Sequence, residues 1–513
     1  MGSDLTTSVQ LGNGKTITLP SGLYINGEWV KPAKGVTLDV YNPATNKVIA
    51  QVYEGDAEDV DAAVKAARAA FEKDDRSWGF GSPQNRAKLL NKLADLVDEN
   101  AELLSAIEAT DQGKTYTSAL YGDIPGVSQT IRYYAGWADK ITGKTYNSIP
   151  GTFSHTRYEP IGVCGQIIPW NFPALMFAWK IGPALATGNT IVMKTAETTP
   201  LSALKIAELI HEAGFPPGVF NLVTGRGPTA GQAIADHMDI DKVAFTGSTF
   251  TGRRIMESAA KSNLKKVTLE LGGKSPNIIF GDVKSIKEAA EWAIFAIGAN
   301  VGQVCTAGSR LLVEETIAEE FTKEFVALTE KIKVGDPFDA GSTQGPLNSE
   351  GHFEKVKGWI KTAVEDGATV ATGGKDISSN NNGGYFLSPT VFTNVKAGHR
   401  ILENEVFGPV VSIQTFKTEE EAVEIANSTQ YGLAAGIFSD SATRLNRLNT
   451  KIRAGTVWNN MYNFASPTIP FGGYKQSGIG RENGEVALLN YLEVKSVIAN
   501  GGEIRSPFAG LSG

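Results

Sequence analysis

Cys305 is the side chain best suited to covalent chemistry in this sequence. It is one of two cysteines in 513 residues and lies in the run Gly302-Gln303-Val304-Cys305-Thr306-Ala307-Gly308-Ser309-Arg310. Its small neighbours let a substrate and main-chain amides approach the sulfur closely. A thiol on a loop between rigid elements is where a nucleophile is expected, although most free cysteines are inert and buried. The sequence alone therefore leaves two interpretations open, a nucleophile or a small core residue.

Two further candidates are Glu270, in an apolar run, and Asn171, in a turn bracketed by prolines. Glu270 interrupts the apolar run Val267-Thr268-Leu269-Glu270-Leu271-Gly272-Gly273-Lys274. Burial there is expected to raise the pKa of its carboxyl and suit it to act as a base, unless it reaches solvent at a strand end. Asn171 lies in the rigid turn Pro169-Trp170-Asn171-Phe172-Pro173. A neutral amide suits an oxyanion hole, although most asparagines in turns bond the turn's own backbone.

One segment resembles a dinucleotide-binding fingerprint but fits it imperfectly. Gly225-Arg226-Gly227-Pro228-Thr229-Ala230 follows an apolar strand and matches G-x-G-x-x-A. The acidic residue expected about 20 positions further on is missing, because Thr246-Gly247-Ser248-Thr249 stands there instead. A tight turn that needs glycine is the alternative, and we interpret this motif as a decoy.

Two other strand ends are stronger candidates for binding a nucleotide. The segment Val243–Thr249 predicts a strand, a glycine turn and a helix that opens at Ser248, whose free amides would favour a phosphate. Lys194 and Glu197 follow the strand at 190–193 and could hold ribose hydroxyls. A carboxylate there repels a 2′-phosphate, which favours NAD over NADP. An ordinary pair of surface charges remains the alternative.

These residues require a parallel sheet to position them. Short apolar strands alternate with helices from Ile161 onward, which predicts βαβ units covered on both faces. A second alternation runs from Pro276 to about Phe438. We therefore expect an α/β protein with two doubly wound parallel-sheet domains. The expected strands of the first set are Ile161–Ile168, Thr190–Met193, Val219–Val223, Val243–Thr246 and Val267–Leu271.

The remaining elements are predicted from local patterns. The pair Asn26-Gly27 between Tyr24 and Val30 predicts a β-hairpin. Helices are expected at Ala57–Lys73, Gln84–Asn100, Ser202–Ala213, Thr229–His237 and Ser285–Asn300, and along the apolar stripe from Ile317 to Ile332. The first twenty residues are polar, and we expect an arm that becomes ordered only on contact.

Composition excludes several classes of protein. The net charge is −7 with dispersed Lys and Arg, so no nucleic-acid partner is expected. No run approaches the ~18 uninterrupted apolar residues of a membrane span. Residues 1–20 fit neither a secretory signal nor a transit peptide, and two cysteines make no disulfide framework. We expect a cytoplasmic protein, or one of the mitochondrial matrix if a leader was removed. No metal is expected.

Taken together, the segments identify the chain as a member of the aldehyde dehydrogenase superfamily. The resemblance runs from Tyr24 to about Val497 and is strongest to the hydrolysing, NAD-linked branch, fungal enzymes included. Its motifs occur in the family's order and spacing. They are Pro169–Pro173, Met193–Glu197, Phe245–Thr249, Leu269–Lys274, Gly302–Arg310, Glu405-Val406-Phe407-Gly408-Pro409 and Pro470-Phe471-Gly472-Gly473-Tyr474-Lys475.

The resemblance implies a role for each catalytic candidate. Cys305 would attack the aldehyde carbon, and the oxyanion would lie between the Asn171 amide and the Cys305 main-chain N–H. Hydride transfer from this hemithioacetal to the nicotinamide would leave a thioester, which Glu270 would hydrolyse by activating water. Lys180 and Glu482 match positions that relay the proton outward. Glu270 also argues against transfer of the acyl group to coenzyme A, because members with that activity lack this base.

The resemblance also implies a cofactor site for NAD, with NADP as a weaker alternative. Glu405 would bind the nicotinamide ribose, Lys194 and Glu197 the adenosine ribose, and Ser248 a phosphate. Gly227 would lie by the adenine. His352 replaces a glutamine common near the adenosine ribose, which puts that contact in doubt. The complete set of expected cofactor residues is Ile168, Trp170, Lys194, Glu197, Gly227, Phe245, Gly247, Ser248, Leu271, Lys355, Glu405 and Phe407.

The residues expected around the substrate differ from those of relatives tuned to acetaldehyde. Ala465 aligns where some relatives carry Phe, although Phe464 could compensate. We expect a pocket that accepts medium-chain or aromatic aldehydes. Its predicted residues are Phe172, Met176, Trp179, Val304, Thr306, Ala465 and Phe471.

By resemblance, the chain divides into three parts. Residues 1–137 and 161–272 would form the NAD-binding domain and residues 273–476 the catalytic domain. Residues 138–160 and 487–501 would form a β-strand extension that pairs subunits into a homodimer or homotetramer, followed by a tail at 502–513. Two rival functions remain open: a coenzyme A-acylating semialdehyde dehydrogenase, and a non-catalytic protein on the same fold.

Overall fold

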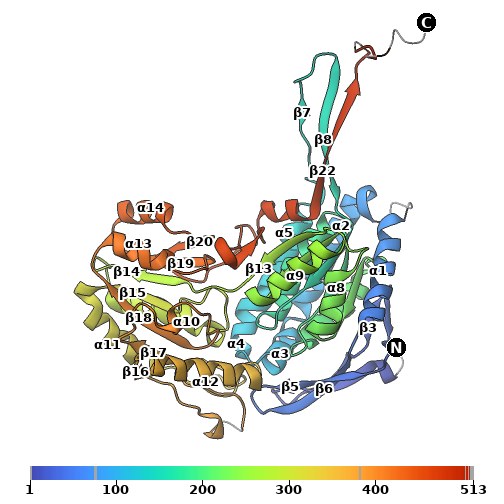
Figure 1. The fold of residues 1–513 in the computed structure, drawn as a ribbon. Coiled ribbons are helices and arrows are strands. Elements are labelled where there is room, and N and C mark those ends of the chain that lie inside the picture. Colours follow the sequence, from blue (N-terminus) through green and yellow to red (C-terminus); the bar gives the residue numbers. More distant parts are fainter. Residues whose placement is uncertain (1–2, 74–77, 381–382, 503, 507, 509–513) are drawn as a thin grey trace.

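The computed structural model describes residues 3–73, 78–380, 383–502, 504–506 and 508. Two large sheets lie beside each other, and a narrow β-arm projects away from them (Figure 1). The predicted fold class, two α/β domains built on parallel sheets, is confirmed.

The first sheet has eight strands and a doubly wound core. Five parallel strands are β9 (Val163–Ile167), β10 (Thr190–Lys194), β11 (Phe220–Val223), β12 (Lys242–Thr246) and β13 (Lys266–Glu270). The sheet order is β21-β13-β12-β9-β10-β11-β3-β4, so the order reverses between β9 and β12. Ligands of such sheets bind outside the carboxyl ends of the strands at this reversal.

Helices cover both faces of the first sheet because its strands are apolar on both sides. One face packs against α1 (Ala57–Glu72), α8 (Gln232–Asp236) and α9 (Thr249–Lys261). The other packs against α6 (Pro173–Ala186) and α7 (Leu201–Ala213). Three further helices pack on these two as an outer layer: α2 (Pro83–Glu99), α3 (Ala101–Asp111) and α5 (Ile124–Ala135). The predicted helix at Thr229–His237 begins instead as a π-helix, Gly227–Gly231, that leads into the short α8.

The second sheet has seven strands in the order β16-β17-β18-β15-β14-β19-β20. Its strands are β14 (Pro276–Ile279), β15 (Arg310–Glu314), β16 (Thr369–Thr372), β17 (Thr390–Thr393), β18 (Val410–Phe416), β19 (Ala434–Phe438) and β20 (Thr456–Asn459), and all but β16 pair in parallel. Helices α10 (Ile286–Gly298) and α11 (Ala318–Thr329) pack on one face, and α13 (Glu419–Asn427) and α14 (Ala442–Lys451) on the other. Helix α12 (Glu350–Glu365) packs near β17.

The N-terminal segment corrects one prediction. Residues expected to be an arm form the antiparallel hairpin β1 (Thr6–Gln10) and β2 (Thr16–Pro20). Val9, Leu11 and Leu19 from this hairpin are buried in the large core cluster, which holds the hairpin on the domain. The predicted Asn26-Gly27 hairpin is confirmed as β3 (Leu23–Ile25) and β4 (Glu28–Val30), and both turn residues have positive φ. A further hairpin pairs β5 (Thr37–Asn42) with β6 (Lys47–Tyr53).

The projecting arm is a three-stranded antiparallel sheet. Strand β8 (Thr152–Pro160) pairs along its whole length with β22 (Leu492–Asn500), and β7 (Thr145–Tyr146) adds an edge (Figure 1). Phe153, Val494 and Ile498 expose more than half of their surface. The predicted tail at 502–513 lies largely outside the described residues. None of the helices in the described ranges combines the length and apolar character needed to cross a lipid bilayer.

Candidate active site

The candidate site lies where the carboxyl edge of the first sheet meets the amino edge of the second. Strand β13 ends at Glu270, and the chain passes through Gly272-Gly273 into β14, which begins at Pro276. The ends of neighbouring strands are tied together, because the Gly247 amide donates to the Glu270 carbonyl over 3.0 Å. Likewise, the Ile168 amide donates to the Lys194 carbonyl over 3.1 Å. Residues that follow four different strands therefore meet at one edge.

Glu270 is a buried carboxyl without a hydrogen-bond partner. Its exposed fraction is 6 %, and neither side-chain oxygen is bonded to the protein. Burial raises its pKa well above the ordinary value, and the nearby charge of Glu482 adds to this, against the opposing effects of Lys180 and Arg481. A carboxyl group with a raised pKa and free lone pairs is suited to bind and deprotonate water.

Cys305 lies against the Gly272-Gly273 turn. A Cβ on Gly273 would collide with the Cys305 carbonyl oxygen, and a Cβ on Gly272 would collide with the Glu405 carboxylate. Only glycines let the turn pass between the two. The thiol is partly buried; its burial raises its pKa, and the charges of Glu405 and Glu270 raise it further. Cys164, the other cysteine, is fully buried within β9 with a pKa raised by burial to about 12.

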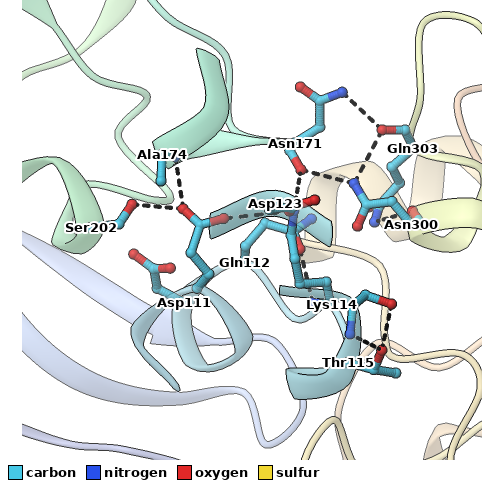
Figure 2. Close-up of polar contacts among 12 residues, drawn as sticks. Asp111, Gln112, Lys114, Thr115, Asp123, Asn171, Ala174, Ser202, Asn300 and Gln303 are labelled. Carbon is cyan, nitrogen blue, oxygen red and sulfur yellow. Dashed lines mark hydrogen bonds and ion pairs between the residues drawn. The ribbon is translucent and has the colours of Figure 1, made fainter. Parts of the chain in front are cut away.

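The Asn171 side chain is hydrogen-bonded to the nucleophile loop, the segment Gly302–Arg310 that carries Cys305. Its Nδ2 donates to the Gln303 carbonyl over 2.9 Å, two residues before Cys305 (Figure 2). An amide nitrogen carries two hydrogens, so one is committed to the loop and the other is left for a ligand. The main-chain carbonyl of Asn171 accepts from Asn300 Nδ2 over 2.8 Å and from Lys114 Nζ over 3.2 Å.

Lys180 and Glu482 form an ion pair close enough to Glu270 for both charges to affect its pKa. Lys180 Nζ contacts Glu482 Oε1 and also donates to Thr246 Oγ1 over 2.6 Å. The other carboxylate oxygen of Glu482 has no hydrogen-bond partner. Glu482 is placed by two main-chain hydrogen bonds with Phe471, so one short bridge orients both a charged residue and a predicted pocket residue.

The expected adenosine-side residues lie at the same sheet edge. Lys194 ends β10, and its Nζ lies 3.2 Å from Glu197, whose side chain is 47 % exposed. Ser248 is the exposed N-cap of α9, and its Oγ accepts from the Thr251 amide. Phe245 and Leu271 are buried, and a Cβ on Gly247 would meet the Phe245 ring. The carboxylate and lysine could hold a ribose, and the free end of the 13-residue helix at the same sheet edge could hold a phosphate.

Gly227 is placed differently from the other expected contacts. It is exposed, has open space where a side chain would be, and begins the π-helix after β11. The G-x-G motif therefore opens no regular helix at which a pyrophosphate would be held in the usual way.

Two expected cofactor residues, Trp170 and Phe407, form an aromatic cluster around His352, which was expected near the adenosine ribose. Its ring lies 5.0 Å from that of Trp170 and 5.9 Å from that of Phe407, and its Nε2 donates to the Phe407 carbonyl over 2.7 Å. Burial lowers the pKa of His352 to about 4, so it is neutral at physiological pH. Glu405 accepts from the Gly273 amide over 2.8 Å, and burial raises its pKa to about 7. Lys355 is exposed on α12.

The structure brings together most, but not all, of the expected substrate residues. Met176, Trp179 and Phe471 are buried in one apolar cluster, against which Phe172 and Cys305 also pack. The rings of Trp179 and Phe471 are 5.2 Å apart. Val304 packs toward α10 instead, Thr306 donates to Asn463, and Ala465 is exposed. Phe464 packs on Trp292 rather than on this cluster.

A buried charged cluster was not anticipated from the sequence. Lys114 pairs with both Glu108 and Asp123. Figure 2 shows Lys114 and Asp123 close to Asn171. Charged residues near a helix end usually reach solvent, so the sequence carried no signal for this cluster. No group of side chains in the described ranges has the composition and geometry of a metal site.

Comparisons with known proteins agree on one family. The profile described as the aldehyde dehydrogenase family matches residues 29–497. An aldehyde dehydrogenase of Emericella nidulans is 54 % identical over 495 residues, which cover 96 % of this chain and 98 % of the relative. The human "aldehyde dehydrogenase, mitochondrial" is 52 % identical over 492 residues, covering 96 % and 94 %. An NAD+ complex of the Bacillus cereus aldehyde dehydrogenase superposes with a TM-score of 0.91 at 49 % identity, covering 93 % and 96 %.

Proposed function

The chain belongs to the aldehyde dehydrogenase family, and from that membership and the site geometry we propose that it oxidises an aldehyde to its carboxylic acid with NAD+ and water. The observation that carries the hydrolytic step is Glu270. It is a buried carboxyl whose two oxygens have no hydrogen-bond partner. It ends β13, and the Gly272-Gly273 turn that follows packs on Cys305.

Each catalytic residue has a defined task in this proposal. The Cys305 thiol gives up its proton to solvent and attacks the aldehyde carbon as the thiolate. The negative charge on the former carbonyl oxygen is stabilised by the free Asn171 amide hydrogen and the Cys305 N–H. After oxidation, a thioester remains on Cys305. Glu270 takes a proton from water as the water attacks this thioester, and the acid leaves while the thiolate is regenerated. The Lys180–Glu482 pair passes the proton outward.

The cofactor assignment rests on residues that fit a dinucleotide. Bound NAD+ supplies the hydride acceptor. Lys194 and Glu197 hold the adenosine ribose, Ser248 a phosphate, and Glu405 with Phe407 the nicotinamide ribose. The Glu197 carboxylate disfavours a 2′-phosphate, so NADP is the weaker cofactor. The remaining assigned contacts are Ile168, Trp170, Gly227, Phe245, Gly247, Leu271 and Lys355.

The test is product analysis with and without coenzyme A. We expect one NADH and one carboxylic acid per aldehyde, with no dependence on coenzyme A. Formation of an acyl-coenzyme A product with little free acid would instead establish the acylating alternative. Absence of NADH formation across aliphatic, aromatic and amino aldehydes would establish a non-catalytic protein.

We propose medium-chain or aromatic aldehydes as preferred substrates. The apolar wall of Phe172, Met176, Trp179 and Phe471 offers more burial to a longer chain, at about 0.8 kcal/mol per buried methylene. The measurement is kcat/KM for hexanal, benzaldehyde and acetaldehyde. An acetaldehyde value about a hundredfold above the other two, some 2.7 kcal/mol, would refute the preference.

We propose that the β7–β8–β22 arm joins subunits into a dimer or tetramer. Its support is the exposed apolar residues Phe153, Val494 and Ile498 on a sheet with open edges. We also propose the division of the chain given above, with boundaries between the parts at residues 137, 160, 272 and 476. Light scattering at micromolar concentration should give a multiple of 54.7 kDa, and a single monomer mass would contradict it.

We propose a cytoplasmic location, with the mitochondrial matrix as the alternative; one relative carries "mitochondrial" in its name. Fractionation of cells expressing the chain distinguishes the two.

A further inference from the structure

We propose that Lys114 is a positioning residue for the oxyanion site, holding the main chain at Asn171 and the ring of Phe172 from below. This inference rests on the proposed function, because it concerns how the Asn171 amide is aimed. Among the described residues, no hydrogen bond or ion pair joins Lys114 to Cys305 or to an expected cofactor residue. Lys114 would act through the turn that carries Asn171.

Four contacts surround the Lys114 ammonium. Its Nζ contacts Asp123 directly and donates to the Asn171 carbonyl over 3.2 Å (Figure 2). It also lies 3.6 Å from Glu108 Oε2 and 4.2 Å from the centre of the Phe172 ring. Lys114 is 2 % exposed, Glu108 0 % and Asp123 8 %. One buried cation therefore touches two consecutive residues of the site, one through its main chain and one through its ring.

The carboxylates fix the lysine, and one of them also fixes the next helix. Glu108 Oε1 accepts from the Ala174 amide over 2.8 Å and from Ser202 Oγ over 2.8 Å. Ala174 is in the first turn of α6, so the same cluster holds the chain on both sides of Phe172. Asp123 is the last residue of the π-helix Ala119–Asp123, a distortion often found at functional sites.

The nucleophile loop closes the network from the other side. Asn300 donates to the same Asn171 carbonyl, and its backbone has φ +45°, with positive φ also at Val301 and Gly302. The Asn171 amide in turn donates to the Gln303 carbonyl. With the carbonyl of Asn171 held by two donors and its amide by one acceptor, the remaining amide hydrogen has a fixed direction. Preorganised donors of this kind are what stabilises a developing oxyanion.

A buried charge cluster is weak evidence for stability alone. Taking charges out of water costs several kcal/mol per ion, and apolar replacements of buried ion pairs are often neutral or stabilising. Burial raises the pKa values of Glu108 and Asp123, which shows the electrostatic cost of keeping them ionised. A role in aiming Asn171 accounts for keeping this cluster here.

The test is a double-mutant cycle between Lys114→Met and Asn171→Ala. The rate of NADH formation is measured with hexanal at saturating NAD+, and NAD+ binding is measured separately. We expect Asn171→Ala to lower the rate by about 10²–10³ and Lys114→Met by about 10–100. If Lys114 acts through Asn171, adding Lys114→Met to Asn171→Ala lowers the rate less than about twofold further. NAD+ affinity should stay within about twofold of wild type.

Lys265→Met is the matched control. Lys265 is 6 % exposed and donates to the Ala235 carbonyl over 2.8 Å, in the same domain but outside the site. It should lower the melting temperature and leave the rate unchanged. If Lys114→Met fails to fold, Lys114→Met with Asp123→Asn removes both charges of the pair and gives the same comparison.

The outcomes separate the two levels of the proposal. Losses that multiply between Lys114→Met and Asn171→Ala, or a folded Lys114→Met at the wild-type rate, overturn the positioning role alone. A wild-type rate for Asn171→Ala overturns the oxyanion role in the proposed function, and the positioning role with it.

Discussion

The Asn171 side-chain amide donates to the Gln303 main-chain carbonyl over 2.9 Å, which joins the first sheet to the loop that carries Cys305. Asn171 follows β9 of the first sheet, whereas Gln303 precedes β15 of the second. Asn300 Nδ2 donates in return to the Asn171 carbonyl over 2.8 Å, so two hydrogen bonds hold the candidate oxyanion donor against the loop of the candidate nucleophile.

The two cysteines should behave oppositely on substitution. Cys305→Ala removes the nucleophile and should lower aldehyde oxidation by at least about 10⁴, while NAD+ binding stays nearly intact. Cys164→Ala, at a buried position within β9, should change neither. Steady-state kinetics and NAD+ titration check both. Equal losses in the two variants would point to damage to the fold rather than to chemistry.

Replacing Glu270 should separate oxidation from hydrolysis. Glu270→Gln keeps the shape but removes the base, so we expect turnover to fall by about 10²–10⁴. The first turnover should survive, giving a burst of NADH that approaches one per active site. Stopped-flow fluorescence measures this burst. Loss of the burst together with turnover would place Glu270 before the thioester.

The Glu482 charge should set the pH dependence of hydrolysis. Glu482 raises the pKa of Glu270, whose carboxyl is active only when deprotonated, so the rate increases as pH rises through that pKa. Glu482→Gln removes the raising charge and leaves that of Lys180, which lowers the pKa of Glu270. The acid limb of the pH–kcat profile should therefore move to lower pH.

Glu419→Gln is the control for this shift. Glu419 is also ion-paired, and its side chain is 13 % exposed, close to the 12 % of Glu482, but it lies on α13 away from the site. Its profile should match that of wild type. Movement of the Glu482→Gln limb to higher pH would contradict the electrostatic assignment.

Glu197 should contribute to the choice of cofactor. Glu197→Ala removes a carboxylate from the expected adenosine ribose site, and we expect the ratio of kcat/KM for NADP to that for NAD to rise about tenfold. Glu208→Ala is the matched control, since Glu208 forms a similar i,i+3 pair with Lys205 on α7. A ratio unchanged in both variants would remove Glu197 from the cofactor site.

Local patterns were sufficient for the strands of the first sheet, and they marked Cys305 and Glu270 as candidates for the site. Strand β10 was predicted within one residue, because buried parallel strands give short, uninterrupted apolar runs. Cys305 was noticeable as a thiol among small residues, and Glu270 as a carboxylate within an apolar run. The N-terminal hairpin was missed because its buried residues, Val9 and Leu19 among them, are few and widely spaced.

Contacts between distant segments were beyond local patterns. Lys114 and Asn171 are 57 positions apart, and their hydrogen bond joins the segment after α3 to the turn before α6. In the sequence, His352 was noted only because it replaces a glutamine that is common near the adenosine ribose. In the structure its ring lies near Trp170 and Phe407, with its Nε2 bonded to the Phe407 carbonyl. Such contacts can be predicted only when the tertiary packing is known.

The central claim, covalent catalysis by Cys305, is tested most directly by trapping the intermediate. Glu270→Gln is mixed with hexanal and NAD+, quenched in acid during the NADH burst, digested and examined by mass spectrometry. We expect the mass of one hexanoyl group on the peptide that contains Cys305 and none on the peptide that contains Cys164. A full NADH burst with no acyl group on Cys305 would contradict the account.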